Sequence, residues 1–182
     1  NGPHMWNLVY INKAWYHLDA TWNDSKQFRR YGYFNVSNDI IQIDHEIYPD
    51  FSLFTGEEIC GTDVKRAVKY NINVPECFSK DANYFNVESI KITSLGRDTD
   101  SKIINDIYTK IMDGERSISF QISESINYKN TILKMFTQSP YKFLFYVESV
   151  NNMLDNKKID QSNIMYSEIE SQRAVVVELN FI

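Results

Sequence analysis

The chain has 182 residues, a formal net charge of −5, 43% hydrophobic residues and 14% aromatic residues. This apolar content predicts a folded chain of one domain or two small ones, and it excludes wholesale disorder. The acidic balance argues against a nucleic acid or an anionic membrane surface as the main partner, and no apolar run approaches the ~18 residues of a membrane span.

The opening segment predicts a β-hairpin. Residues 4–11 and 14–22 are rich in aromatic and aliphatic side chains, and Asn12-Lys13 provides a two-residue turn between them. This turn places Trp6 opposite Asp19 and makes His4 a diagonal neighbour of Asp19 on the same side of the sheet. The other side is expected to be the core face, and it carries Met5, Asn7, Val9, Ile11, Ala14, Tyr16, Leu18 and Ala20.

The middle of the chain has a weaker pattern. We expect a helical turn or two at residues 38–45 and an irregular insertion at about 49–74, with one helix at 62–70. Residues 75–85 are expected to cross back to the body of the protein.

The last part of the chain has a clear periodicity of apolar side chains. Strands are expected at 87–93, 116–122, 162–170 and 173–181, and helices at 98–113, 127–137 and 141–154. Asp98 or Thr99 is the expected cap of the first of these helices, and Gly114 follows its end. The order β-α-β-α-α-β-β predicts a small α/β sandwich, so the fold class is α+β, with one domain at 1–86 and a second at 87–182.

His4 and Asp19 together have the residue types of a catalytic dyad. A carboxylate fixes the imidazole tautomer, and the other ring nitrogen then accepts a proton from a Ser or Cys nucleophile. Trp6 and Trp22 would shield the pair from water. The alternative is that His4 and His17 are ordinary half-buried strand histidines and that Asp19 is satisfied by a backbone amide.

The motif "HMWNLVYINKAWYHLDATWND", followed by "YGYFNVSNDIIQIDH" and "VPECFSKDANYF", resembles the bacterial transglutaminase-like superfamily. The resemblance covers residues 4–45 closely and 74–85 loosely. It implies that residues 1–86 are the β-hairpin and antiparallel sheet of a papain-like core, with residues 87–182 as a following domain.

The resemblance also implies a function. His4 matches the family's general base and Asp19 its orienting residue in a Cys-His-Asp triad, with Trp6, Asn7, Trp15, Thr21 and Trp22 as framework. The implied chemistry is thiol acyl transfer on protein or peptide amides, ending in hydrolysis or crosslinking. It also implies a bacterial protein that is secreted or held at the cell surface or cell envelope, with cell-wall components as further candidate partners.

The cysteines depart from this pattern. The family's nucleophile lies upstream of the histidine strand, whereas Cys60 and Cys77 lie downstream and are either reduced thiols or a disulfide. We therefore expect a fragment, inactive alone, whose nucleophile lies upstream of Asn1, with Cys60 as the alternative because triads tolerate any chain order. "GPHM" also matches the scar of a cleaved tag, which His4 either belongs to or coincides with. The alternative function is a non-catalytic binding or structural module.

The triplet Asp44-His45-Glu46 contains three side chains of the kinds that bind metal ions. A metal site there would need a third ligand that the sequence does not nominate, so a turn closing a helix is favoured. We expect no metal and no organic cofactor.

Overall fold

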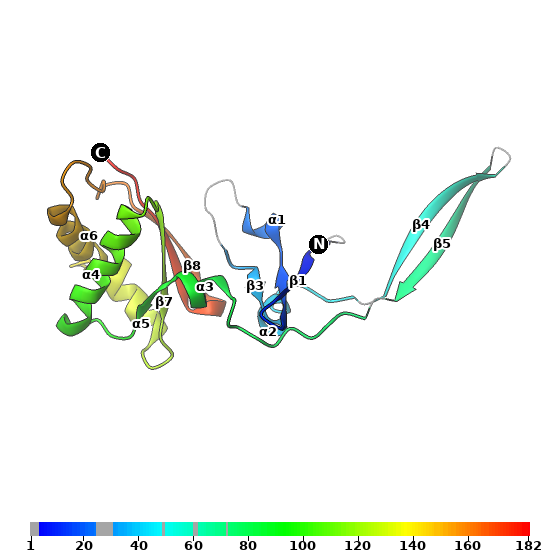
Figure 1. Cartoon of the computed structure of the whole chain (residues 1–182), viewed down its shortest axis with the longest axis horizontal. Coiled ribbons are helices and arrows are strands. Elements are labelled where there is room, and N and C mark those ends of the chain that lie inside the picture. The colour runs from blue at the N-terminus through cyan, green and yellow to red at the C-terminus, as the bar shows by residue number, and fades with distance from the viewer. Residues whose placement is uncertain (1–3, 25–30, 49, 60–61, 72) are drawn as a thin grey trace.

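The computed structural model describes residues 4–24, 31–48, 50–59, 62–71 and 73–182, with the side chains of 50–71 excepted. These residues have a mixed α+β architecture with three sheets, and the strands, whose bounds follow below, are arranged in the orders β1-β2-β3, β4-β5 and β6-β7-β9-β8. The four-stranded sheet and its helices form one end of an elongated molecule, and β1–β3 lie in the middle (Figure 1). Among the described residues, no helix is both long and apolar enough to cross a membrane.

The opening hairpin has the predicted register. β1 (Asn7–Ile11) and β2 (Ala14–Leu18) are antiparallel, with Leu8 opposite His17 and Tyr10 opposite Trp15. The turn residues Asn12 and Lys13 have φ angles of 50° and 67°. Positive φ at both positions is what a two-residue hairpin of this type requires, and it follows the twist of the strands.

The prediction that the second strand continues to residue 22 is wrong. The strand ends at Leu18, and the short helix α1 (Ala20–Asn23) begins directly after Asp19. The Asp19 side chain accepts hydrogen bonds from the backbone N–H groups of Thr21 and Trp22. An aspartate in this position satisfies amides that a helix start leaves unpaired, and this local capping ends the strand.

The expected core face of the hairpin is also only partly correct. Tyr16 is buried, but Met5 is 91% exposed and Ala20 is exposed. The side that carries the dyad is buried too, since His17 and Asp19 are 0% and 1% exposed. The reason is that the segment after β3 (Phe34–Val36), the third strand of the sheet, packs over the histidine side.

The middle of the chain corrects another expectation. The helical turn at 38–45 is confirmed as α2 (Asn38–Ile41) and the turn after it. Instead of an irregular insertion with a helix, however, β4 (Asp50–Ile59) and β5 (Thr62–Asn71) form a regular antiparallel ribbon that extends away from the other elements (Figure 1). The expected helix at 62–70 is therefore wrong: Val64, Val68 and Tyr70 are spaced by even numbers, which fits the two-residue period of a strand.

The second part of the chain has the predicted order of elements. After α3 (Tyr84–Glu88), which was not predicted, this part contains β6 (Ile90–Ile92), α4 (Arg97–Met112), β7 (Ser117–Ile122), α5 (Tyr128–Ile132), the π-helical turn η1 (Leu133–Thr137), α6 (Lys142–Met153), β8 (Met165–Ile169), the 3₁₀ turn η2 (Glu170–Gln172) and β9 (Ala174–Glu178). The first strand is shorter than expected because residues 87 and 88 belong to α3. The cap of α4 is Gly96, not Asp98 or Thr99.

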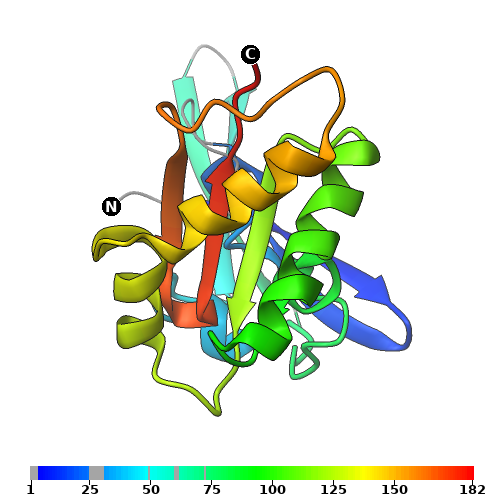
Figure 2. The same cartoon turned by 90° about the vertical axis from the view of Figure 1, so that its left-hand side faces the viewer.

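The four-stranded sheet is covered on both faces. α4, α5 and α6 cover one face, where Val175 and Val177 of β9 enter the main hydrophobic core (Figure 2). On the opposite face, Ala174 and Val176 pack against Phe85 of α3. β9 is therefore a central, apolar strand, as its run of alanine and valine predicts.

Candidate functional site: a His-Asp-His cluster

The structure brings His4 and Asp19 into direct contact, as the hairpin register predicts. His4 Nε2 lies 2.5 Å from Asp19 Oδ2, and the Asp19 side chain is 1% exposed. The other carboxylate oxygen, Oδ1, accepts hydrogen bonds of 2.9 and 3.1 Å from the backbone N–H groups of Thr21 and Trp22. Asp19 thus makes both of the contacts that the sequence suggested, because one oxygen faces the His4 imidazole and the other caps α1.

His45 is a third member of the cluster, and sequence reasoning did not place it there. Its Nε2 lies 3.2 Å from the same Asp19 Oδ2, and its side chain is 3% exposed. Its Nδ1 lies 2.5 Å from Asp44 Oδ1, and Asp44 also accepts a hydrogen bond from the Tyr33 hydroxyl. The turn after α2 positions it, since the His45 backbone N–H donates to Ile41 O.

The environment of Asp19 favours its charged form. Burial alone would raise the pKa of this carboxyl, but the hydrogen bonds from Trp22 N–H, His4 and His45 outweigh burial and lower the pKa below its usual value. Asp19 is therefore a carboxylate at neutral pH, able to accept a hydrogen from each imidazole.

Aromatic rings enclose the cluster. The Trp22 and Trp6 rings lie 4.4 and 5.1 Å from the His45 ring, measured between centroids, and Trp22 lies 5.9 Å from the His4 ring. These rings keep water from the two hydrogen bonds of Asp19 Oδ2, and a lower local dielectric strengthens them. The His4 side chain retains 27% exposure. Among the described residues, none bonds its second ring nitrogen, Nδ1.

His17 is structural and supports this enclosure. Its Nδ1 accepts a 2.9 Å hydrogen bond from the Trp6 indole N–H, and its Nε2 lies 2.8 Å from Asn38 Oδ1. Burial lowers the pKa of His17, and the nearby His45 charge lowers it further, although the Asn38 bond acts in the opposite direction. Protonation would set an Nδ1–H against the indole N–H, so the neutral ring holds Trp6 in place.

The five expected framework residues divide into two groups. Trp6, Thr21 and Trp22 contact the cluster as described. Asn7 is exposed, and the Trp15 ring packs 5.1 Å from the Tyr10 ring near the turn of the hairpin. The structure therefore does not bring Asn7 or Trp15 to the cluster.

The one cysteine that lies among the described residues does not have the environment of a nucleophile. Cys77 is a free thiol that is 0% exposed, and its Sγ lies 3.7 Å from Pro75 O. Burial, together with the Glu76 charge, raises the pKa of Cys77 to about 11. Cys60 lies outside the described residues.

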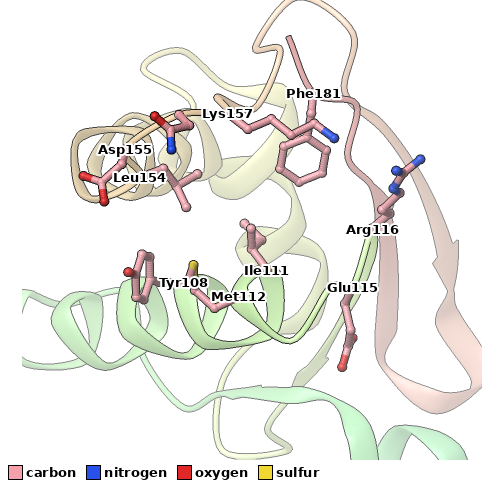
Figure 3. A pocket seen from close by; sticks show the side chains of 11 residues that line it. Tyr108, Ile111, Met112, Glu115, Arg116, Leu154, Asp155, Lys157 and Phe181 are labelled. Carbon is pink, nitrogen blue, oxygen red and sulfur yellow. The ribbon is translucent and has the colours of Figure 1, made fainter.

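Two other surface features lie apart from the cluster. Figure 3 shows side chains that line a hollow between α4, residues 154–157 and Phe181. The hollow has a volume of about 390 Å³, and the Lys157 ammonium lies 5.1 Å from the centroid of the Phe181 ring in a cation-π contact. On α6 and just before it, Tyr141 and Phe145 are 40% and 47% exposed, whereas Phe143 and Tyr146 are buried. The aromatic segment at 140–148 therefore presents only part of its rings to solvent.

No family model matches the sequence, and no curated protein matches it.

Proposed function

We propose that His4 and Asp19 are the general base and orienting carboxylate of a thiol acyl-transfer site that acts on protein or peptide amides. The observation that supports this proposal is the buried Asp19 carboxylate, held by two backbone amides with Oδ2 directed at His4 Nε2. A carboxylate held in this way fixes the imidazole with hydrogen on Nε2, which leaves Nδ1 with a lone pair.

In the proposed reaction, His4 Nδ1 accepts the proton of a cysteine thiol, and the thiolate attacks an amide carbonyl. The imidazolium that forms is stabilised by Asp19, and it returns the proton to the departing amine as the C–N bond breaks. The resulting thioester is resolved by water, which gives hydrolysis, or by an amine, which gives a crosslink. Either step restores the free thiol.

The nucleophile in this proposal comes from outside the described residues. Cys77 is unsuited because its thiol is buried and has a raised pKa, whereas a reactive cysteine has a lowered pKa and partial exposure. We propose an upstream cysteine, consistent with the chain order of the family that the sequence resembles.

The test is an assay of the natural full-length protein on glutamine-containing peptides, with ammonia release and amine incorporation as readouts. His4→Gln and Asp19→Asn should each lower kcat about a thousandfold or more with a small effect on KM, because both residues act in the transition state. Asp39→Asn is the matched control, since it removes an exposed carboxylate outside the cluster and should leave kcat unchanged. Full activity in His4→Gln would disprove the proposed role.

A non-catalytic binding or structural module of a secreted or cell-surface protein is the second candidate. It is favoured by the absence, among the described residues, of a cysteine in contact with His4, and by the exposed rings of Tyr141 and Phe145. A full-length protein that folds but shows neither hydrolysis nor amine incorporation would support this candidate over the first.

A further inference from the structure

We propose that His4, Asp19 and His45 bind a divalent transition-metal ion through His4 Nε2, His45 Nε2 and Asp19 Oδ2, and that zinc fits this donor set best. The proposal goes beyond the acyl-transfer function and does not depend on it. It concerns what these three side chains bind when no substrate is present.

The first argument is the convergence of three ligand atoms. One atom from each of His4, Asp19 and His45 lies within 4.8 Å of the other two, and Asp19 and His45 are buried. Two imidazole nitrogens and one carboxylate oxygen form a typical three-ligand set for zinc with an open fourth position. Hard cations such as calcium and magnesium prefer sets of oxygen ligands, so the two imidazoles argue against them.

The second argument is the support behind the ligands. Metal-binding histidines commonly donate their other ring N–H to a carboxylate, and His45 Nδ1 lies 2.5 Å from Asp44 Oδ1. Ligating carboxylates are usually held by further hydrogen bonds, and Asp19 Oδ1 accepts two from Thr21 and Trp22. A pair of histidines that were only packed in a core would not need these further hydrogen bonds to His45 and Asp19.

The third argument is that the site needs little movement to accept the ion. Zinc bonds of about 2.0–2.2 Å in a tetrahedral arrangement place ligand atoms about 3.3–3.6 Å apart. The His45 Nε2 to Asp19 Oδ2 separation of 3.2 Å is already close to the lower end of this range. The His4 Nε2 to Asp19 Oδ2 separation of 2.5 Å must widen, and His4 is the most exposed of the three ligands and precedes β1.

Metal binding and general-base chemistry would exclude each other at this site. When a metal takes the lone pair of His4 Nε2, the hydrogen of the neutral ring lies on Nδ1. That nitrogen can then no longer accept a thiol proton. The proposed zinc site is therefore an inhibitory site with respect to the acyl-transfer reaction.

The test is a zinc titration of the whole chain, without an affinity tag, followed by NMR of the imidazole nitrogens. The chain has three histidines, so His17 serves as an internal reference. We expect one equivalent of zinc to shift Nε2 of His4 and His45 and to leave the neutral tautomer of His17 unchanged. Cobalt substitution should give a spectrum without thiolate charge-transfer bands, which separates this site from binding at Cys60 or Cys77.

Variants identify the ligands. His45→Gln and Asp19→Asn should abolish the shifts. Asp44→Asn changes a side chain that is 38% exposed, and it should weaken zinc binding about 10- to 100-fold. Asp39→Asn, at a 59% exposed side chain, is the matched control and should bind zinc like the wild type.

Two results would overturn the proposal. One is a wild-type chain that takes up no zinc from an equimolar solution. The other is zinc binding of equal strength in the wild type, Asp44→Asn and His45→Gln. Because zinc uptake is measured on the chain itself, failure of the acyl-transfer assay would leave this result unaffected.

Discussion

The indole of Trp6 connects the structural residue His17 with the two histidines of the candidate site, His4 and His45. Its N–H donates to buried His17, while its ring packs against His4 and His45. The Trp6 side chain thus links β2 to the candidate site. A side chain with both a polar and an apolar contact is sensitive to loss of either one.

Replacing Trp6 with Phe should test this connection. The change keeps an aromatic ring but removes the donor to His17 Nδ1, so the free energy of unfolding should fall by about 1–3 kcal/mol. Urea unfolding would measure it. Trp15→Phe is the matched control, because Trp15 is 38% exposed and packs on Tyr10 near the turn, and its effect should be smaller. Equal losses would contradict the special role of Trp6.

Cys77 gives a pH-dependent prediction. Burial raises the pKa of Cys77 to about 11, so its thiolate fraction stays small up to that pH and its alkylation rate should rise with pH over the whole range from 7 to 11. At pH 8, iodoacetamide should modify Cys77 roughly a hundredfold more slowly in the folded chain than in urea. Peptide mapping by mass spectrometry would separate Cys77 from Cys60. Rapid modification of Cys77 in the folded chain would show that the thiol is accessible.

At the scale of elements, the helix α4 was predictable from its side-chain period, whereas the ten-residue strands β4 and β5 and the short elements α1, α3 and β3 were not. The helix α4 follows from apolar residues at helical spacing, and its end follows from Gly114. By contrast, α1, α3 and β3 contain only three to five residues each. Elements of this length have too few residues for a period to be recognised, and tertiary contacts and caps decide them.

Gly114 allows the end of α4 to be tested. Its φ angle is +90°, and the N–H groups of Gly114 and Glu115 close the helix onto Ile111 O and Lys110 O. Gly114→Ala should lower the free energy of unfolding by about 1 kcal/mol through backbone strain alone, since a Cβ there meets no atom within 4 Å.

Gly32→Ala is the matched control for this change. Its φ lies outside the left-handed region, and a Cβ there would make an ordinary 3.8 Å contact with Ile169 Cγ2. Thermal unfolding would measure the loss of stability in both variants. A Gly32→Ala variant that loses as much stability as Gly114→Ala would argue against strain as the cause.

At the scale of the whole molecule, Gln172 connects the two parts of the chain. Its Nε2 donates to Gly32 O at 2.6 Å, and its Oε1 accepts from Asn83 Nδ2 at 2.8 Å. Gln172 lies between β8 and β9, so this side chain links the four-stranded sheet to the segment that leads into β3. The contact of Phe85 with Ala174 and Val176 supplies the apolar part of the same junction.

Gln172→Ala should therefore destabilise the junction. The change removes the buried hydrogen bonds that Gln172 makes with the Gly32 carbonyl and the Asn83 amide. The free energy of unfolding should therefore fall by about 1–3 kcal/mol. Urea unfolding would measure the loss, with faster amide exchange expected around residues 31–36. Gln138→Ala, at an exposed position after η1, should be nearly neutral. A neutral Gln172→Ala would mean that Phe85 and its neighbours hold the junction alone.

The sequence by itself determined the hairpin turn, its register and therefore the meeting of His4 with Asp19. It also determined the order of strands and helices after residue 90. These features follow from local rules, because a two-residue turn fixes which residues are opposite each other and side-chain periods distinguish strands from helices.

Only the tertiary structure decided the place of His45 and the burial of the histidine side of the hairpin. His45 is 26 residues from Asp19 in the sequence, and it reaches the carboxylate because α2 and its turn pack over β2 beside Trp6 and Trp22. The spacing of side chains along one segment does not specify which turn packs over which strand. This packing depends on the burial of side chains that are distant from one another in the sequence.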